Sequence, residues 1–432
     1  MASHPDTLAK KHLLSDRQQL LLRELFPAPD VSNHGSPAKP GISPGTAHKV
    51  VGFLLNHEGG HQAAHILPIA RAFALRYPNQ SVPVIVMQGA AEAEARRFLA
   101  DAPRNILLQV MRPATKIAKA ATRLLGNAVP FDRISSLKEN LDLFNGLDAL
   151  VVPEKTSLML KTRFGLPHLK MIHTRHGAGD RAVGFDKASS QFDFVLLSGA
   201  KVRDRLKDNG AIRDDNYAMV GYPKFDVDNR KARSRLFNND RPTILYNPHP
   251  TPALSSWFAM GEDVLEYFAR NDQYNLIFAP HVMLFAKRWS ISLSPPSIAR
   301  VRSVAKRFHG LSNIHIDLGS AASVDMTYTR SADIYLGEAS SQVYEFLAHP
   351  RPCIFLNAGG HAWREDPNFA HWQAGEVIED ISELGYALDG AVRMPSAFRD
   401  AQEKLFSYTF DLNELPSSIR AAEAISAYLG RN

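Results

Sequence analysis

The sequence predicts an α/β protein built from two doubly wound, Rossmann-like lobes. Three observations predict this fold class. The chain has 432 residues, which is enough for two domains. Short apolar runs alternate with helical stretches, as parallel strands and crossover helices do. The alternation is interrupted once by a polar, charged stretch and then starts again, so it describes two lobes rather than one large sheet.

The first lobe is expected over residues 48–225, and a hinge over 226–241. Helices are predicted over 62–76 and 91–100. The predicted strands lie near 49–55, 83–88, 105–111, 148–152, 169–173 and 193–198.

The second lobe is expected over residues 242–432, and helices near 395–406 and 416–429 should close it. Its predicted strands are Thr243–Asn247, Asn275–Ala279, Ile314–Asp317, Asp333–Leu336 and Cys353–Leu356. Ahead of both lobes, residues 1–47 combine an amphipathic helix over 8–26 with a linker rich in proline and glycine.

Composition excludes several classes of protein. Hydrophobic residues make up 45% and charged residues 22%, as in an ordinary globular chain, so dominant disorder is excluded. A single cysteine, Cys353, excludes an intramolecular disulfide and fits a reducing cytoplasm. No run approaches the roughly 20 apolar residues of a spanning helix, and no signal peptide pattern opens the chain. We therefore expect a cytoplasmic protein.

The net charge of +6 fits anionic small molecules or lipid surfaces, whereas no nucleic-acid motif accompanies it, so nucleic acid is not an expected partner. The basic stretch Arg112–Leu125 has two interpretations. It is either a plain surface helix or a peripheral contact with anionic lipid at the inner face of the cytoplasmic membrane.

A polar loop follows the first strand. It contains His57, Gly59, Gly60 and His61, and it either binds an acceptor or simply caps the next helix. The glycines lack the GxGxxG spacing of a dinucleotide site, and the histidines lack a clear third metal ligand. The sequence therefore predicts neither a cofactor nor a bound metal.

A histidine at the end of a later strand is the candidate for proton transfer. His176 can accept a proton near neutral pH, and Gly177 allows a substrate to approach the backbone. His173 is an alternative for the same role. Arg175 and Arg181 could hold a phosphate or remain solvated.

The second lobe supplies candidate donor-binding residues. His249 and His281 each follow a strand and a proline, at the edge where α/β sheets bind ligands. Ser340 and Ser341 lie between a strand and a helix, where backbone N–H groups can face a phosphate or the serines can simply cap the helix. Glu338 and Glu345 flank these serines.

These motifs resemble those of the CDP-glycerol glycerophosphotransferases, the teichoic-acid polymerase type. The resemblance covers roughly residues 148–358. Arg175-His176-Gly177 resembles their Trp-His-Gly segment, Pro280-His281 their Pro-His element, and Gly337–Phe346 their Thr-Asp-Tyr-Ser-Ser motif with its helix. The chain departs from the pattern with arginine for tryptophan, Glu338 for aspartate and Ala339 for tyrosine. The carboxyl-terminal pattern resembles UDP-GlcNAc 2-epimerases and nucleotide-sugar glycosyltransferases more loosely.

The resemblance implies a GT-B fold, His176 as general base, and His281, Ser340 and Ser341 as contacts to the donor phosphates. The remaining expected donor contacts are Arg175, Gly177, His249, Glu338 and Glu345. The expected activity is transfer of a glycerophosphate or glycosyl group from a nucleotide-activated donor to a hydroxyl of a polymer or lipid-linked acceptor. An epimerase acting on UDP-sugars and a non-catalytic nucleotide-binding protein are the alternatives.

Overall fold

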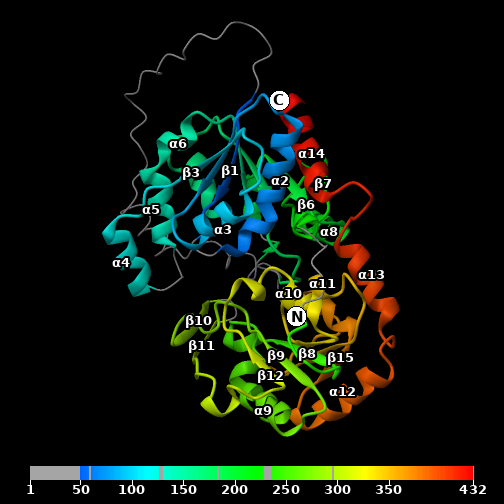
Figure 1. Cartoon of the computed structure of the whole chain (residues 1–432). Helices are drawn as coiled ribbons and strands as arrows, with labels where there is room; N and C mark the ends of the chain where they lie inside the picture. The colour runs from blue at the N-terminus through cyan, green and yellow to red at the C-terminus, as the bar shows by residue number, and fades with distance from the viewer. Residues whose placement is uncertain are drawn as a thin grey trace, which may run out of the picture. The chain divides into compact units, whose positions relative to one another are not determined.

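The computed structural model describes residues 49–57, 60–125, 130–181, 184–185, 187–227, 235–293 and 296–431. The chain divides into two compact units (Figure 1). The first comprises Met1–His176, Phe185–Val227 and Asp411–Asn432, and the second Gly177–Gly184 and Asp228–Phe410. The amphipathic helix and linker predicted for residues 1–47 lie outside the described residues. None of the described helices is long and apolar enough to span a bilayer.

The first unit is built on a seven-stranded parallel sheet with strand order β3-β2-β1-β4-β5-β6-β7. This order reverses between β1 and β4, as in Rossmann folds. The strands are β1 (Val51–Leu55), β2 (Val82–Val86), β3 (Ile106–Val110), β4 (Ala149–Val152), β5 (Lys170–Thr174), β6 (Phe194–Leu197) and β7 (Tyr217–Met219). The first six correspond to the predicted strands, whereas the short edge strand β7 was not predicted.

Helices cover both faces of this sheet because successive strand residues point to opposite sides. Leu54 of β1 packs into one core, while Phe53 and Leu55 pack into the other. The described helices of this unit are α2 (Ala63–Arg76), α3 (Ala90–Phe98), α4 (Lys116–Leu125), α5 (Phe131–Glu139), α6 (Leu141–Asn145), α7 (Met159–Thr162), α8 (Ala200–Asp208) and α14 (Ser417–Arg431).

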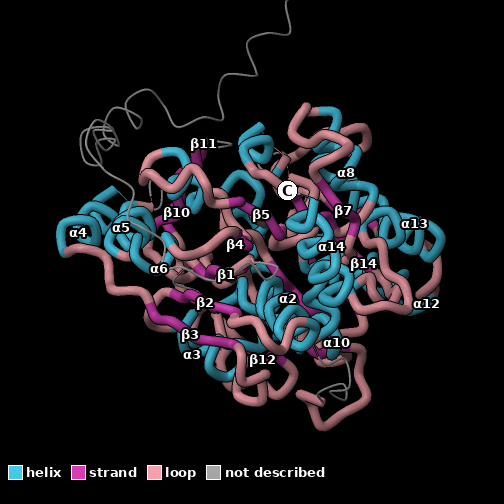
Figure 2. Tube along the Cα trace, turned by 90° about the horizontal axis from the view of Figure 1, so that it is seen from above, coloured by secondary structure: helices cyan, strands magenta, loops and turns pink. Residues whose placement is uncertain are grey.

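The last helix of the chain, α14, belongs to the first unit, although the sequence analysis placed it in the second lobe. Its apolar face, which includes Ala421 and Ile425, packs beside α2 (Figures 1 and 2). Asp226 accepts hydrogen bonds from the backbone N–H groups of Ser417 and Ser418 at its start. The residue expected at the hinge therefore caps a helix that returns from the end of the chain.

The second unit has a six-stranded parallel sheet with order β12-β9-β8-β13-β14-β15, which again reverses once, between β8 and β13. Its strands are β8 (Thr243–Asn247), β9 (Asn275–Phe278), β12 (Ile314–Ile316), β13 (Ile334–Gly337), β14 (Cys353–Leu356) and β15 (Glu376–Ile378). A separate antiparallel hairpin joins β10 (Trp289–Leu293) and β11 (Pro296–Arg300). The hairpin and β15 were not predicted.

The helices of the second unit are α9 (Ser256–Arg270), α10 (Thr327–Ser331), α11 (Gln342–Phe346), α12 (Leu384–Arg393) and α13 (Arg399–Thr409). Two 3-10 segments, η8 (Pro252–Leu254) and η11 (Pro367–Ala374), lie near the carboxyl edge of the sheet's central strands. One core, on a single face of the sheet, combines residues of α9 and α12 with alternate residues of β8, β9, β13 and β14. The fold class predicted from the sequence, two Rossmann-like α/β units, is confirmed.

Candidate functional site

The candidate site for the nucleotide-activated donor lies where the strand order of the second sheet reverses. β8 ends in Asn247 and leads to His249, and β13 ends in Gly337 and leads to Glu338. In open α/β sheets this edge is where ligands bind. The segment Gly177–Gly184, which also belongs to the second unit, lies against it, because a Cβ on Gly177 would stand 3.4 Å from Ser341 Oγ. The φ of +85° at Gly177 explains why glycine occupies this close approach.

Two histidines and an arginine bring hydrogen-bond donors together here. The backbone N–H of Thr251 donates to Nδ1 of His249 at 3.0 Å, and a guanidinium nitrogen of Arg181 lies 3.1 Å from its Nε2. A neutral imidazole has one proton, so in either tautomer one of these contacts joins two donors. An acceptor-only group, such as a phosphate oxygen, would resolve that conflict.

His281 adds a further hydrogen-bond donor to this group. Its ring centre lies 6.2 Å from that of His249. The N–H of Met283 donates to its Nδ1 at 3.3 Å, which leaves the proton of the neutral ring on Nε2. Desolvation and then the nearby charge of Arg181 lower the pKa of His281 to about 4, and the same two effects hold the pKa of His249 well below its ordinary value. Both rings are therefore neutral donors at neutral pH.

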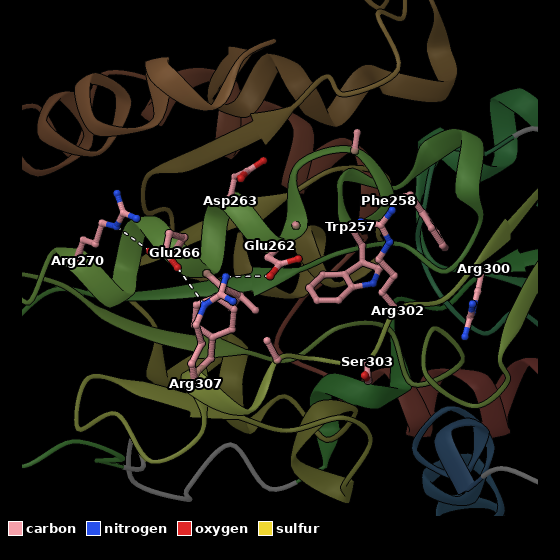
Figure 3. A pocket seen from close by; sticks show the side chains of 15 residues that line it. Trp257, Phe258, Glu262, Asp263, Glu266, Arg270, Arg300, Arg302, Ser303 and Arg307 are labelled. Carbon is pink, nitrogen blue, oxygen red and sulfur yellow. Dashed lines mark hydrogen bonds and ion pairs between the residues drawn. The ribbon is translucent and has the colours of Figure 1, made fainter.

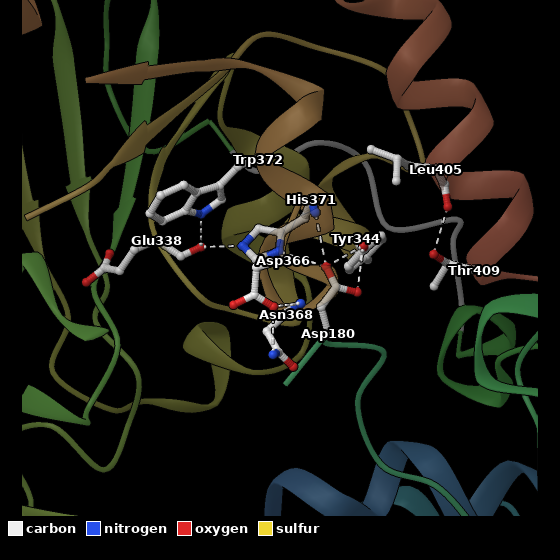
Figure 4. Close-up of polar contacts among 9 residues, drawn as sticks. All are labelled: Asp180, Glu338, Tyr344, Asp366, Asn368, His371, Trp372, Leu405 and Thr409. Atoms are coloured by element: carbon white, nitrogen blue, oxygen red, sulfur yellow. Dashed lines mark hydrogen bonds and ion pairs between the residues drawn. The ribbon is translucent and has the colours of Figure 1, made fainter. Parts of the chain in front are cut away.

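Hydrogen bonds to Asp180 hold in place the segment that contains Arg181 (Figure 4). Its buried carboxylate accepts hydrogen bonds from the Tyr344 hydroxyl at 2.8 Å and from both the backbone N–H and Nδ1 of His371, at 3.0 and 2.8 Å. Nε2 of His371 in turn lies 2.8 Å from the carbonyl oxygen of Glu338. Asp180, Tyr344 and His371 were not predicted as site residues, because nothing in their spacing joins positions so far apart along the chain.

Glu338 is buried beneath the site rather than exposed in it, with only 1% of its surface accessible. One carboxyl oxygen accepts hydrogen bonds from the backbone N–H groups of His249 and Ser256, at 3.1 and 2.6 Å. The other oxygen contacts no hydrogen-bond donor among the described residues. Glu338 therefore positions His249 and the start of α9. From the sequence, we expected this residue to contact the nucleotide-activated donor.

Burial gives Glu338 a testable effect on stability. Desolvation raises its pKa to about 8, so the folded protein binds this proton more tightly than the unfolded chain. The carboxyl should thus destabilise the protein progressively as pH rises from about 4.5 to about 8. We expect Glu338→Gln to be more stable than the wild type by about 2–4 kcal/mol at pH 9, with little difference at pH 5. Urea unfolding at both pH values measures this.

The exposed Glu365 offers a matched control, because Glu365→Gln should leave the two unfolding curves unchanged at either pH. Equal stability of Glu338→Gln and the wild type at pH 9 would contradict the assigned protonation.

The two serines have different surroundings. Ser340 Oγ accepts the backbone N–H of Gln342, the first residue of α11, at 3.2 Å. Ser341 is half-buried, and its hydroxyl makes no hydrogen bond within the part of the chain that the structure describes. Glu345 is buried within α11. Of this motif, Ser341 is the side chain best placed for a ligand.

His176 lies in the first unit, after the end of β5. Its Nδ1 donates a hydrogen bond to the carbonyl oxygen of Pro153, so Nε2 is the basic nitrogen of the neutral ring. Desolvation, partly offset by that hydrogen bond, lowers the pKa of His176, although the ring remains exposed. This tautomer and pKa suit a general base at neutral pH.

The alternative base, His173, is buried. Its ring stacks on Phe192 with centres 4.4 Å apart, and desolvation holds its pKa well below the ordinary value. Arg175 also has a structural contact, because its guanidinium lies over the ring of Phe185, 4.6 Å from the centre. Arg175 belongs to the first unit.

The expected acceptor loop is described in part. Gly60 packs so closely on α3 that a Cβ would stand 2.9 Å from Cβ of Glu94, which gives this glycine a structural reason. His57 is half-buried, whereas Gly59 and the His61 side chain lie outside the described residues. Asn56, which was not predicted as a site residue, is fully buried after β1, and neither of its amide atoms is bonded to a described residue. The described residues contain no group of three His, Cys, Asp or Glu that could hold a metal ion.

Comparison with known proteins shows what this fold resembles. No protein-family model and no curated protein matches the sequence. Among solved structures, the wall teichoic acid polymerase TagF soaked with CDPG matches with a TM-score of 0.57 at 14% identity, over 89% of both chains. A putative UDP-N-acetylglucosamine 2-epimerase from Listeria monocytogenes matches with a TM-score of 0.55 at 12% identity, over 89% of this chain and 96% of that one.

The UDP-GlcNAc 2-epimerase from Neisseria meningitidis, bound to UDP-GlcNAc, matches with a TM-score of 0.51 at 14% identity, over 89% of this chain and 99% of that one. Identities this low establish similarity of fold. The chain thus has an α/β fold of the GT-B type, built from two Rossmann-like units and similar to the folds of these polymerases and epimerases.

Proposed function

We propose that this protein is a transferase that uses a nucleotide-activated donor, of the CDP-glycerol or nucleotide-sugar class, and transfers its glycerophosphate or glycosyl group to an acceptor hydroxyl. The observation that carries the proposal is that Arg181, His249 and His281 lie together at the edge where the second sheet reverses. A guanidinium nitrogen of Arg181 is 3.1 Å from Nε2 of His249, and the centres of the two imidazole rings are 6.2 Å apart. A diphosphate supplies acceptor oxygens and negative charge at that point. The similar structures include one soaked with CDPG and one bound to UDP-GlcNAc.

In the proposed reaction His176 Nε2 removes the proton of the acceptor hydroxyl, and that oxygen attacks the donor. With a CDP-glycerol donor a new P–O bond forms, the bond to the leaving phosphate breaks, and CMP is released. With a nucleotide sugar the oxygen attacks the anomeric carbon and the nucleoside diphosphate leaves. Arg181, His249 and His281 would stabilise the charge that grows on the leaving phosphate.

The acceptor is a hydroxyl of a polymer or a lipid-linked chain, which we propose from the same class of reaction. The direct test incubates the full chain with CDP-glycerol and with a panel of nucleotide sugars, each with and without acceptor. Release of CMP only with acceptor supports phosphotransfer, and release of a nucleoside diphosphate only with acceptor supports glycosyl transfer. An isomerised UDP-sugar without acceptor would overturn the transferase in favour of an epimerase, and no turnover would favour a binding protein.

Substitution of Arg181 tests the donor site itself. Arg181→Gln should weaken the binding of CDP by about 10- to 100-fold, because a charge-assisted contact to phosphate is lost. Arg181→Lys, which keeps the charge without the fork of donors, should lose less. Calorimetric titration with CDP measures both.

A second measurement separates a local effect from misfolding. Arg181 lowers the pKa of His281, so the pKa of that imidazole should rise in Arg181→Gln, as seen by NMR titration. Arg399→Gln, at an exposed ion pair with Glu403, is the matched control. Unchanged CDP affinity together with an unchanged His281 titration would remove Arg181 from the site.

A further inference from the structure

The hairpin β10–β11 of the second unit exposes an apolar face. Trp289, Ile291 and Ile298 are 55%, 67% and 66% accessible, which is unusual for three neighbouring large apolar side chains. The antiparallel register pairs Ile291 with Ile298 and Trp289 with Arg300, so these four residues share one face.

The opposite face of the hairpin is turned towards the body of the unit. It has Ser290 and Ser292 on one strand and Ser297 and Ala299 on the other. The hydroxyl of Ser290 donates to the carbonyl oxygen of Pro250 at 2.6 Å, which ties this face to the chain beside η8. The polar face is therefore the inner one, the reverse of the usual arrangement on a surface sheet.

Positively charged residues flank the apolar face in the sequence. Between Asp272 and Asp317 the sequence has no aspartate or glutamate, but it has Lys287, Arg288, Arg300, Arg302, Lys306 and Arg307. Arg300 and Arg302 are exposed, and neither forms an ion pair with a residue that the structure describes. Exposed arginines beside exposed tryptophan and isoleucine are the chemistry that an anionic membrane surface complements.

The adjacent cavity does not account for these arginines. It has a volume of about 530 Å³ and lies between α9 and the chain after β11 (Figure 3). Arg307 there pairs with Glu262 and Glu266, and Arg270 also pairs with Glu266. Because the acidic side chains of α9 offset most of the positive charge, the cavity is a poor site for an anion, whereas Arg300 and Arg302 remain available at its rim.

The stretch Arg112–Leu125, which includes α4 and is the membrane contact considered from the sequence, fits a surface less well. Ala114 and Ala118 pack into the core of the first unit, and Arg112 donates to the carbonyl oxygen of Glu139 at 2.9 Å. Ile117 is the one large apolar side chain that α4 exposes among its described side chains.

We propose that the β10–β11 hairpin is a membrane-docking element: Trp289, Ile291 and Ile298 enter the interface of an anionic bilayer, and Arg288, Arg300 and Arg302 contact its lipid phosphates. The hairpin would hold the second unit at the membrane whether or not the chain is the transferase proposed above.

Flotation of the full chain with vesicles tests the proposal. The wild type should bind vesicles of phosphatidylcholine and phosphatidylglycerol in equal amounts, bind pure phosphatidylcholine much less, and dissociate in high salt. Ile291→Ser with Ile298→Ser, and separately Arg300→Gln with Arg302→Gln, should each lower the bound fraction at least about tenfold. Tyr386→Ser with Met394→Ser, at exposed residues elsewhere in the same unit, should bind as the wild type does.

Fluorescence locates the contact independently of the affinity. Brominated lipids should quench the tryptophan emission of the wild type, and Trp289→Phe should still bind while losing that quenching. Vesicle binding that is unchanged in the isoleucine variant would overturn the proposal and assign docking to another segment. Absence of vesicle binding together with a dimer in light scattering, lost in the same variant, would overturn it in favour of a second copy of this chain.

Discussion

Replacement of His176 by alanine should lower the rate of transfer by about 10²–10⁴-fold, the usual effect of removing a general base. The hydrogen bond from Nδ1 to the carbonyl oxygen of Pro153 makes Nε2 the nitrogen that accepts the proton. CDP should bind the variant as tightly as the wild type, because the residues assigned to the phosphates belong to the second unit. Steady-state rates with saturating donor and a calorimetric titration measure the two quantities.

The pH profile provides a check on mechanism. Desolvation lowers the pKa of His176, so its neutral form persists below the ordinary histidine pKa of 6.5. The acid limb of the rate should accordingly lie below pH 6.5 and disappear from the residual rate of His176→Ala. His168→Ala, at an exposed histidine of the same unit, should behave as the wild type. An unaltered rate in His176→Ala would remove the residue from the reaction.

Asp180→Ala should lower the free energy of unfolding by about 3–5 kcal/mol, because three buried hydrogen-bond donors lose their acceptor at about 1–3 kcal/mol each. The substitution leaves the hydroxyl of Tyr344 and two N–H groups of His371 buried without their acceptor. Tyr344→Phe removes only the hydroxyl that donates to this carboxylate, at 2.9 and 2.8 Å from its two oxygens, and should cost about 1 kcal/mol. Denaturant unfolding of the full chain measures both.

Asp180 also positions Arg181, its neighbour in the chain, so Asp180→Asn should weaken CDP binding even where the protein stays folded. Amide exchange in the segment around Gly179 should become faster in that variant. Asp366→Asn provides the control, because Asp366 caps η11 at the Asn368 N–H without contacting the segment. A loss below about 1 kcal/mol for Asp180→Ala would show that the buried network contributes little.

The sequence predicted the regular core of both sheets because a buried parallel strand leaves a local signal. β1, β8 and β14 appear as short apolar runs between turns. The segments that escaped prediction are short or lie at sheet edges, where burial is incomplete: β7 and β15 each have three residues. In the hairpin β10–β11, the large apolar side chains alternate with small residues but lie on the exposed face, so burial does not explain this pattern.

The same distinction applies to the candidate site: residues with a local sequence signal were predicted, and residues defined by distant contacts were not. Residues placed directly after predicted strands, such as His249 and His281, lie at the expected edge of their sheet. The depth of Glu338 below that edge could not be predicted, because glutamate does not reveal from sequence whether backbone N–H groups will surround it. His371 was missed because its partner Asp180 lies 191 positions away.

By itself, then, the sequence determined the class of fold, the strands of two Rossmann-like cores and the residues at their carboxyl ends, since each of these depends on local periodicity and on the polarity of neighbouring positions. Only the tertiary structure decided that α14 returns to the first unit, that Gly177–Gly184 belongs to the second, and that Asp180 and His371 form a buried pair. Those outcomes depend on contacts between distant parts of the chain, and an amphipathic helix or a single polar residue carries no local record of the surface on which it will pack.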